Sequence, residues 1–164
     1  MKTSLNNYKL ALLAGACLVL SVDHSAAENP APDAAAITAT VESFHKALAA
    51  GKPDEVMSLL QPDALIVEGG SVETRAEYES GHLGEDIAYA RAVPGKQLKA
   101  VVRQEGDAAW VTSTFSVVGV FQGRSVNSLA AETMVLTKAA AGWRICAIHW
   151  SSHKAAKSQT GSAK

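Results

Sequence analysis

The chain has 164 residues, with 15 lysines and arginines against 16 aspartates and glutamates, so its formal net charge is −1. This balance, without a long basic run, excludes nucleic-acid binding by electrostatic attraction. The length is sufficient for one domain with a single core, and no internal repeat is visible.

Residues 1–27 have the pattern of a secretory signal peptide. Two lysines precede an apolar run over 10–22 that is short for a membrane span, and the small residues Ser-Ala-Ala end at Ala27. We therefore predict cleavage after Ala27 and a periplasmic or secreted protein. Only Cys146 would remain after cleavage, so the exported chain would form no internal disulfide and would depend on packing.

Two alternatives for the N-terminus remain open. Ala14-Gly15-Ala16-Cys17 fits a lipoprotein signal, which would leave Cys17 acylated and hold the protein at a membrane. The apolar run continues after Cys17, where a lipoprotein would have a polar linker, so this is the second choice. An uncleaved anchor is the third. Contact with a membrane is predicted only if Cys17 is lipidated.

Composition divides the rest of the chain into three parts. Residues 28–33 are proline-rich and acidic, which predicts a flexible segment, and residues 153–164 are small and polar, which predicts a disordered tail. The sequence between them, residues 34–152, alternates regular apolar patterns with turn signals. It predicts one folded domain.

The first part of this domain has helical periodicity. A helix is expected over 34–50, where one apolar stripe contains Ile37, Val41, Phe44 and Leu48. His45 and Lys46 lie off this stripe and are interpreted as solvated. Pro53 opens a second short helix that ends at 61–63, before a strand over 64–68.

A third helix is expected from Arg75 to about Arg91, broken near two glycines. Thr74 and Glu77 have the spacing of a capping box, in which a hydroxyl and a carboxylate satisfy free amides at a helix start. Tyr78, His82 and Asp86 recur every four residues, so a continuous helix would place them on one face.

From residue 96 onward the apolar period changes to two, which predicts strands over 97–105, 108–121 and 126–138. A hairpin over 131–152, with its turn at 139–142, contributes the last strand. Alternation divides that strand into two rows. The row predicted to face inward is Trp143, Ile145, Ala147, His149 and Ser151, and the row predicted to face outward is Arg144, Cys146, Ile148 and Trp150.

The predicted fold class is therefore α+β: a curved antiparallel sheet wrapped around N-terminal helices, forming a cone with an opening at one end. The apolar outward row of the last strand gives the convex face a surface suited to a homodimer.

Several segments resemble one family. The Glu68-Gly69-Gly70 turn, the stretch over 77–88 and the C-terminal stretch over 142–152 are similar to the SnoaL-like branch of the nuclear transport factor 2 superfamily, across residues 34–152. This resemblance implies a cone that also houses ketosteroid isomerases and polyketide cyclases, and it places the acidic base of those isomerases at Glu68. The tyrosine and aspartic acid that hold the oxyanion in them have no counterpart, because the first helix contains no tyrosine.

The candidate catalytic residues are Glu68, His82, Asp86 and His149. We predict that they line one cavity, with Asp86 beside His82 and Glu68 near the rim. The candidate ligand-binding residues are Tyr78, Trp143 and Ser151, which lie on the same predicted faces. Each candidate catalytic residue also has a purely structural interpretation. Glu68 would be a surface carboxylate, His82 and Asp86 a solvated pair, and His149 a core histidine with satisfied hydrogen bonds.

Three functions remain open. The cone binds a small apolar ligand and moves a proton on it by acid–base chemistry, as in isomerases, cyclases or hydrolases. Alternatively, it binds the ligand without turnover or forms a dimeric scaffold. In the third, carboxylates and imidazoles converge on a divalent metal, although the sequence has no close-spaced metal motif. No cofactor is predicted, and the sequence leaves open whether the protein is an enzyme.

Overall fold

The computed structural model describes residues 31–156, so the predicted signal peptide and Cys17 lie outside the described residues. The helices are α1 (Ala34–Ala50), α2 (Pro53–Leu59), α3 (Arg75–Ser80) and α4 (Leu83–Ala92). The strands are β1 (Leu60–Glu68), β2 (Ser71–Thr74), β3 (Gly95–Glu105), β4 (Ala108–Phe121), β5 (Arg124–Ala139) and β6 (Gly142–Lys154). None of the helices in this part of the chain is long and apolar enough to span a membrane.

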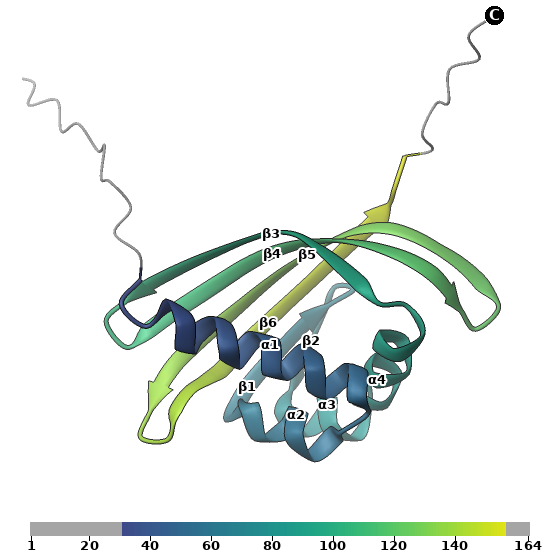
Figure 1. Ribbon diagram of the computed structural model, residues 1–164. Coiled ribbons are helices and arrows are strands. Elements are labelled where there is room, and N and C mark those ends of the chain that lie inside the picture. Colours follow the sequence, from purple (N-terminus) through teal and green to yellow (C-terminus); the bar gives the residue numbers. More distant parts are fainter. Residues whose placement is uncertain (1–30, 157–164) are drawn as a thin grey trace, which may run out of the picture.

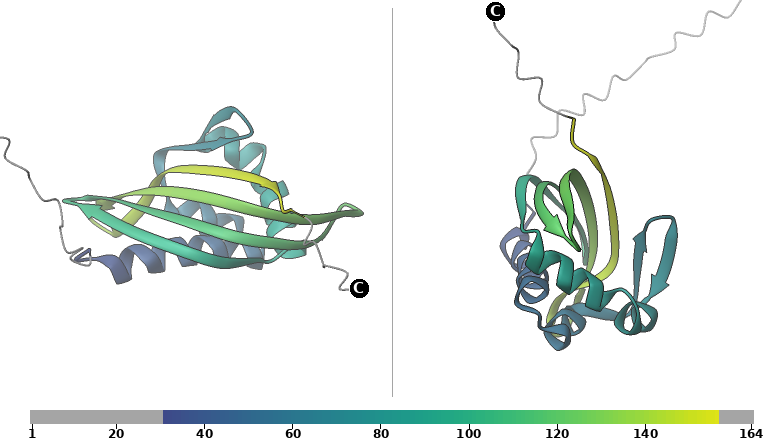
Figure 2. Two further views of the ribbon diagram at one scale, coloured as in Figure 1. Left: turned by 90° about the horizontal axis from the view of Figure 1, so that it is seen from above. Right: turned by 90° about the vertical axis from the view of Figure 1, so that its right-hand side faces the viewer.

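The predicted α+β fold class is confirmed. One six-stranded sheet has the order β2-β1-β6-β5-β4-β3, and its long strands curve over α1 (Figure 1). An end-on view shows the helices on the inner side of this curve (Figure 2). One pair departs from the prediction, because β1 runs parallel to β6. The long chain segment between these two strands permits a parallel pair.

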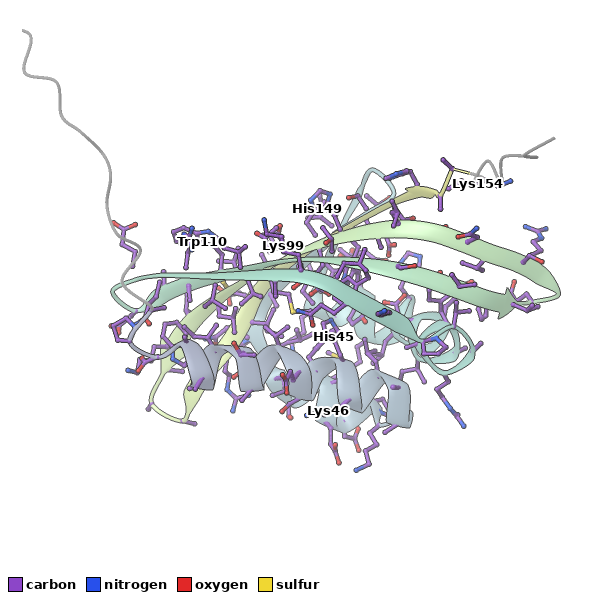
Figure 3. The ribbon with its side chains drawn as sticks, turned by 45° about the horizontal axis from the view of Figure 1, so that its top comes forward. His45, Lys46, Lys99, Trp110, His149 and Lys154 are labelled. Atoms are coloured by element: carbon purple, nitrogen blue, oxygen red, sulfur yellow. The ribbon has the colours of Figure 1, made fainter. Side chains whose placement is uncertain are left out.

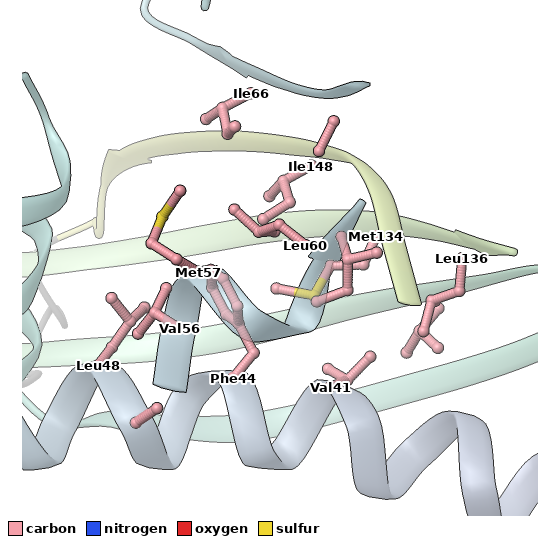
Figure 4. Close-up of a cluster of buried hydrophobic side chains, with 14 of the residues drawn as sticks. Val41, Phe44, Leu48, Val56, Met57, Leu60, Ile66, Met134, Leu136 and Ile148 are labelled. Carbon is pink, nitrogen blue, oxygen red and sulfur yellow. The ribbon is translucent and has the colours of Figure 1, made fainter. Parts of the chain in front are cut away.

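Helix α1 has the predicted bounds and buries the predicted stripe against the sheet (Figure 4). It ends at Gly51, whose φ of 71° is the left-handed conformation that glycine adopts without steric cost. The stripe meets buried residues of α2, β1, β5 and β6, among them Val56, Leu60, Met134, Leu136 and Ile148. The core therefore lies between α1 and the concave face.

Strand β1 begins four residues earlier than predicted. Pro62 was expected to close the second helix, but it lies inside β1. The pairing of β1 with β6 is interrupted between Leu60 and Leu65, so the proline, which has no N–H to donate, occupies the irregular part of the ladder. Ala64 and Ile66 are buried as the alternation predicted.

The predicted helix after Thr74 starts where expected, and its capping box is present. It divides at Gly81 and His82 into α3 and α4. This break matters for the site, because residues spaced every four along the sequence no longer lie on one helix face.

A bulge in β6 overturns the predicted facing of its second half. Leu136 pairs with Ile145 and Val135 with Ala147, so Cys146 is an extra residue and the alternation shifts by one. Ile148, predicted to face outward, is 1% exposed in the core. His149, predicted to face inward, is exposed on the convex face, on the opposite side of the sheet from His45 (Figure 3). Ser151 is exposed as well.

Candidate functional site

The residues predicted to share one cavity are separated by the fold. Asp86, Tyr78, Glu68 and His82 gather where α3 and α4 approach the end of β1. His149 and Ser151 lie on the outer side of the sheet as a consequence of the bulge. Trp143, a candidate ligand-binding residue in the sequence, is buried in the core, with Lys138 Nζ 5.9 Å from its ring centroid.

The central contact of this group joins α3 to α4. Tyr78 is fully buried, and its hydroxyl donates a hydrogen bond of 2.9 Å to Asp86 Oδ2. Burial raises the pKa of Asp86 to about 6, while the Tyr78 hydrogen bond acts in the opposite direction. Burial and the adjacent Asp86 raise the pKa of Tyr78 far above its ordinary value. The pair therefore contains a carboxyl group that changes protonation close to neutral pH.

Glu68 supplies a second carboxyl group to the same region. Partial burial raises its pKa, the His82 charge opposes that rise, and Glu73 adds to it. The negative charge of Glu68 in turn contributes to the raised pKa of Asp86. The two carboxyl groups are thus coupled through space, as neighbouring acids are when water is partly excluded.

The hydrogen-bond partner of His82 is Glu73, and the predicted direct pairing with Asp86 is wrong. His82 Nδ1 lies 2.7 Å from Glu73 Oε2, whereas the Asp86 carboxylate accepts from Tyr78. The pKa of His82 is raised mainly by the hydrogen bond and charge of Glu73, with Asp86 contributing at longer range. The short strand β2, which carries Glu73, was not predicted and supplies this partner.

A second polar cluster lies inside the cone and was missed by the sequence analysis. Glu132 on β5 is only 3% exposed. Its Oε2 accepts a hydrogen bond of 2.8 Å from Trp150 Nε1 and lies 2.8 Å from His45 Nε2. Its other oxygen, Oε1, is buried and has no hydrogen-bond partner among residues 31–156. A glutamate in the same alternating row as Met134 and Leu136 was the sequence signal for an inward carboxylate.

Aromatic rings connect the two clusters. Trp150 lies with its ring centroid 6.5 Å from that of Tyr78 and 6.3 Å from that of Phe44. The His45 ring meets Phe115 edge to face at 5.7 Å. These spacings are typical of aromatic packing. The inner wall therefore places an aromatic surface between Asp86 and Glu132.

Neither of two open hollows is bordered by Asp86 or Glu132, although Phe115, whose ring meets His45, borders the second. One, of about 470 Å³, is bordered by α2, β1 and the guanidinium groups of Arg75 and Arg144. Arg75 donates to Met57 O and Arg144 to Ser58 O, so both side chains satisfy carbonyls at the end of α2. The other, of about 410 Å³, is bordered by Leu98, Leu129 and neighbouring residues that include Ser151.

The described residues do not support the metal alternative. Within 31–156, no three histidine, cysteine, aspartate or glutamate side chains come close enough to hold a metal ion. His82 pairs with Glu73, and His149 is exposed on the outer face of the sheet, so the four residues named for this alternative do not form such a group.

A family model for the SnoaL-like domain matches residues 37–154. The chain belongs to this family. A structure named a candidate ketosteroid isomerase from Shewanella frigidimarina is 36% identical, covers 71% of this chain and 94% of that chain, and has a TM-score of 0.68. The resemblance inferred from the sequence is thus confirmed. Comparison with the curated proteins gives no match.

More distant structures show how widely the fold is used. A candidate dehydratase of the nuclear transport factor 2-like family from Streptomyces avermitilis is 21% identical, covering 77% of this chain and 100% of that chain, with a TM-score of 0.66. The CaMKII hub of S. rosetta is 22% identical, covering 76% of this chain and 100% of that chain, with a TM-score of 0.60. At these identities the likeness concerns the fold alone.

The raised pKa of Asp86 predicts a pH-dependent effect on stability. The folded chain holds the Asp86 proton more tightly than the unfolded chain does. The protonated Asp86 therefore contributes fully to the free energy of unfolding below about pH 4, and this contribution is lost as the pH rises through about 6. Asp86→Asn, which cannot ionise but can still accept from Tyr78, should stabilise the protein at pH 7.5 by about 1–3 kcal/mol. Thermal unfolding followed by circular dichroism at pH 4.5 and 7.5 measures this difference.

The matched control is Glu105→Gln, which neutralises an exposed glutamate at the end of β3. It should change the melting temperature little at either pH. An Asp86→Asn protein that gains no stability between pH 4.5 and 7.5 relative to wild type would contradict the burial of an ionised carboxylate at this position.

Proposed function

We propose that the protein binds a small, mostly apolar molecule in its cone and that Asp86 transfers a proton to or from it. The observation that carries this proposal is the Asp86 carboxyl group, whose pKa is raised to about 6 and which accepts a hydrogen bond from the fully buried Tyr78. A general base works best when its pKa lies near the operating pH. The aromatic wall beside it suits an apolar substrate.

Tyr78 and Glu68 have supporting roles in this proposal. The Tyr78 hydroxyl fixes the orientation of the Asp86 carboxylate, and the nearby Glu68 raises the Asp86 pKa by repulsion. A carbon acid is the simplest substrate class for such a site. The ionised Asp86 would take a proton from the carbon next to a ketone, the C–H electron pair would remain in the enolate, and the carboxyl group would later return a proton.

Hydrogen exchange into a simple ketone tests this chemistry. With 2-tetralone in D₂O as the probe, we expect the protein to accelerate replacement of the α-hydrogens by deuterium, followed by NMR. The rate should rise with pH and level off above about 6, as Asp86 ionises. Asp86→Asn should slow the protein-dependent exchange about 100-fold or more, which is typical for loss of a general base.

His149→Gln is the matched control, because His149 lies on the outer face of the sheet. It should leave the exchange rate unchanged. Equal rates for wild type and Asp86→Asn would refute the role of Asp86. Binding of 2-tetralone without any accelerated exchange would favour the alternative function, a non-catalytic ligand-binding protein.

We also propose that the protein is exported by its N-terminal residues 1–27, which have the composition of a signal peptide. N-terminal sequencing of the chain secreted from a bacterium should find Glu28 as the first residue. A chain that still begins at Met1 would refute cleavage, and a lipid on Cys17 would replace this proposal with membrane anchoring.

We also propose that the protein forms a homodimer through the convex face of the sheet. The row of the last strand that was predicted to form this interface includes Ile148, which is buried. Other apolar side chains are exposed on this face: Leu98, Trp110, Val118, Val120 and Leu129. Structural relatives named as a hub and as a kinase association domain are consistent with self-association. An exposed apolar surface of this kind is commonly covered by a partner.

Leu129→Glu should break the dimer, because Leu129 borders the hollow of about 410 Å³ on this face and a buried charge there would be unpaired. Sedimentation velocity at micromolar concentration should show a dimer for wild type and a monomer for the variant. Val72→Glu places a charge at an exposed site on β2 and should remain dimeric. A monomeric wild type would refute the dimer.

A further inference from the structure

The direction of the hydrogen bond between His45 and Glu132 depends on the tautomer of the His45 ring. An indole N–H can only donate, so Glu132 Oε2 acts as an acceptor toward Trp150. The same oxygen lies 2.8 Å from His45 Nε2. With Glu132 ionised, Nε2 must carry the hydrogen, and the other ring nitrogen of a neutral His45, Nδ1, then presents a lone pair.

Nδ1 of His45 is open to a ligand. Within residues 31–156 it has no hydrogen-bond partner, and the side chain is 34% exposed although its carboxylate partner is only 3% exposed. The ring projects between α1 and the sheet (Figure 3). Phe115 lies at its edge, and both Phe115 and Trp150 are part-exposed. In the Nε2–H tautomer, an acceptor nitrogen therefore lies at the margin of an aromatic surface.

We propose that His45 anchors the ligand of the cone, with Nδ1 accepting a hydrogen bond from a hydroxyl or N–H group of an aromatic molecule that packs against Phe115 and Trp150. The inference rests on the proposed function, since it assumes that the cone binds a ligand. It adds a requirement that the earlier proposal does not contain: the apolar ligand must carry a hydrogen-bond donor.

Electrostatics favours a donor over an anion at this position. In the described part of the chain, Glu132 Oε1 is buried without a hydrogen bond, and the hydrogen bonds to this carboxyl group are made at Oε2. An anionic ligand beside this carboxylate would be repelled, whereas a neutral O–H or N–H group would meet an acceptor. Glu132 itself acts as a positioning residue, because it holds the His45 tautomer and is too buried to touch the ligand.

Two probes of nearly the same shape test the inference. p-Cresol and p-xylene differ by a hydroxyl group in place of a methyl group. Titration into wild type, followed by the Trp150 indole N–H and His45 ring signals in NMR, should show p-cresol binding about threefold to tenfold more tightly, as expected for one additional hydrogen bond. The ¹⁵N shifts should also show the Nε2–H tautomer in the free protein.

His45→Phe removes the acceptor and keeps an aromatic ring, so it should abolish the preference for p-cresol while p-xylene still binds. His149→Phe, on the opposite face of the sheet, should keep the preference. Glu132→Gln provides a second variant: loss of the charge should weaken control of the tautomer, visible in the ¹⁵N shifts, and reduce the preference.

The outcomes separate this inference from the proposed function. Equal affinity of both probes in wild type, or a preference that survives in His45→Phe, overturns the anchor while leaving ligand binding in the cone intact. If neither probe shifts the Trp150 or His45 signals, both the anchor and the binding of small aromatic molecules are refuted. Proton transfer by Asp86 is measured separately with 2-tetralone and does not depend on His45.

Discussion

The structure depends on packing α1 against the concave face of the sheet. Phe44 and its stripe neighbours are buried only because the long strands curve over the helix, and the same curvature brings β5 and β6 close to α1. Burial of large aromatic and aliphatic side chains is the dominant favourable term in folding. The helix at the same time fixes His45, one residue after Phe44, opposite Glu132. The core and the inner polar cluster are therefore products of one contact.

Polar groups inside this core reduce its stability. Among the residues that the structure describes, Asp86 is half-buried and accepts a hydrogen bond from Tyr78, and one oxygen of Glu132 has no hydrogen-bond partner. A buried carboxylate without full hydrogen bonding destabilises a fold relative to an apolar residue of similar size. The two carboxylates are joined through Tyr78 and Trp150, which pack against each other. Such groups, concentrated on one wall of a core, are what a binding or catalytic site requires.

The sequence was sufficient for the fold class and most element bounds, because helical stripes, turn residues and period-two strands are local signals. It was insufficient where a single extra residue shifts which side chains face the core. The bulge at Cys146 leaves no mark in an apolar strand, yet it exchanges the faces of Ile148 and His149. The break at His82 similarly redirected that side chain to Glu73. Both errors concern geometry set by the neighbouring strand or helix, which alternation and spacing do not contain.

The two buried carboxyl groups of the candidate site lie on different parts of the fold. Glu132 lies on β5, in the middle of the sheet, whereas Asp86 lies in the first turn of α4, in the helical segment between β2 and β3. Side chains on the inner strands of a sheet are held more rigidly than those on a short helix at its margin. A ligand held by the sheet-bound cluster could thus be approached by the acid on α4. In the function proposed above, His45 and Glu132 would orient the ligand and Asp86 would transfer the proton, with Tyr78 and Trp150 as the surface between them.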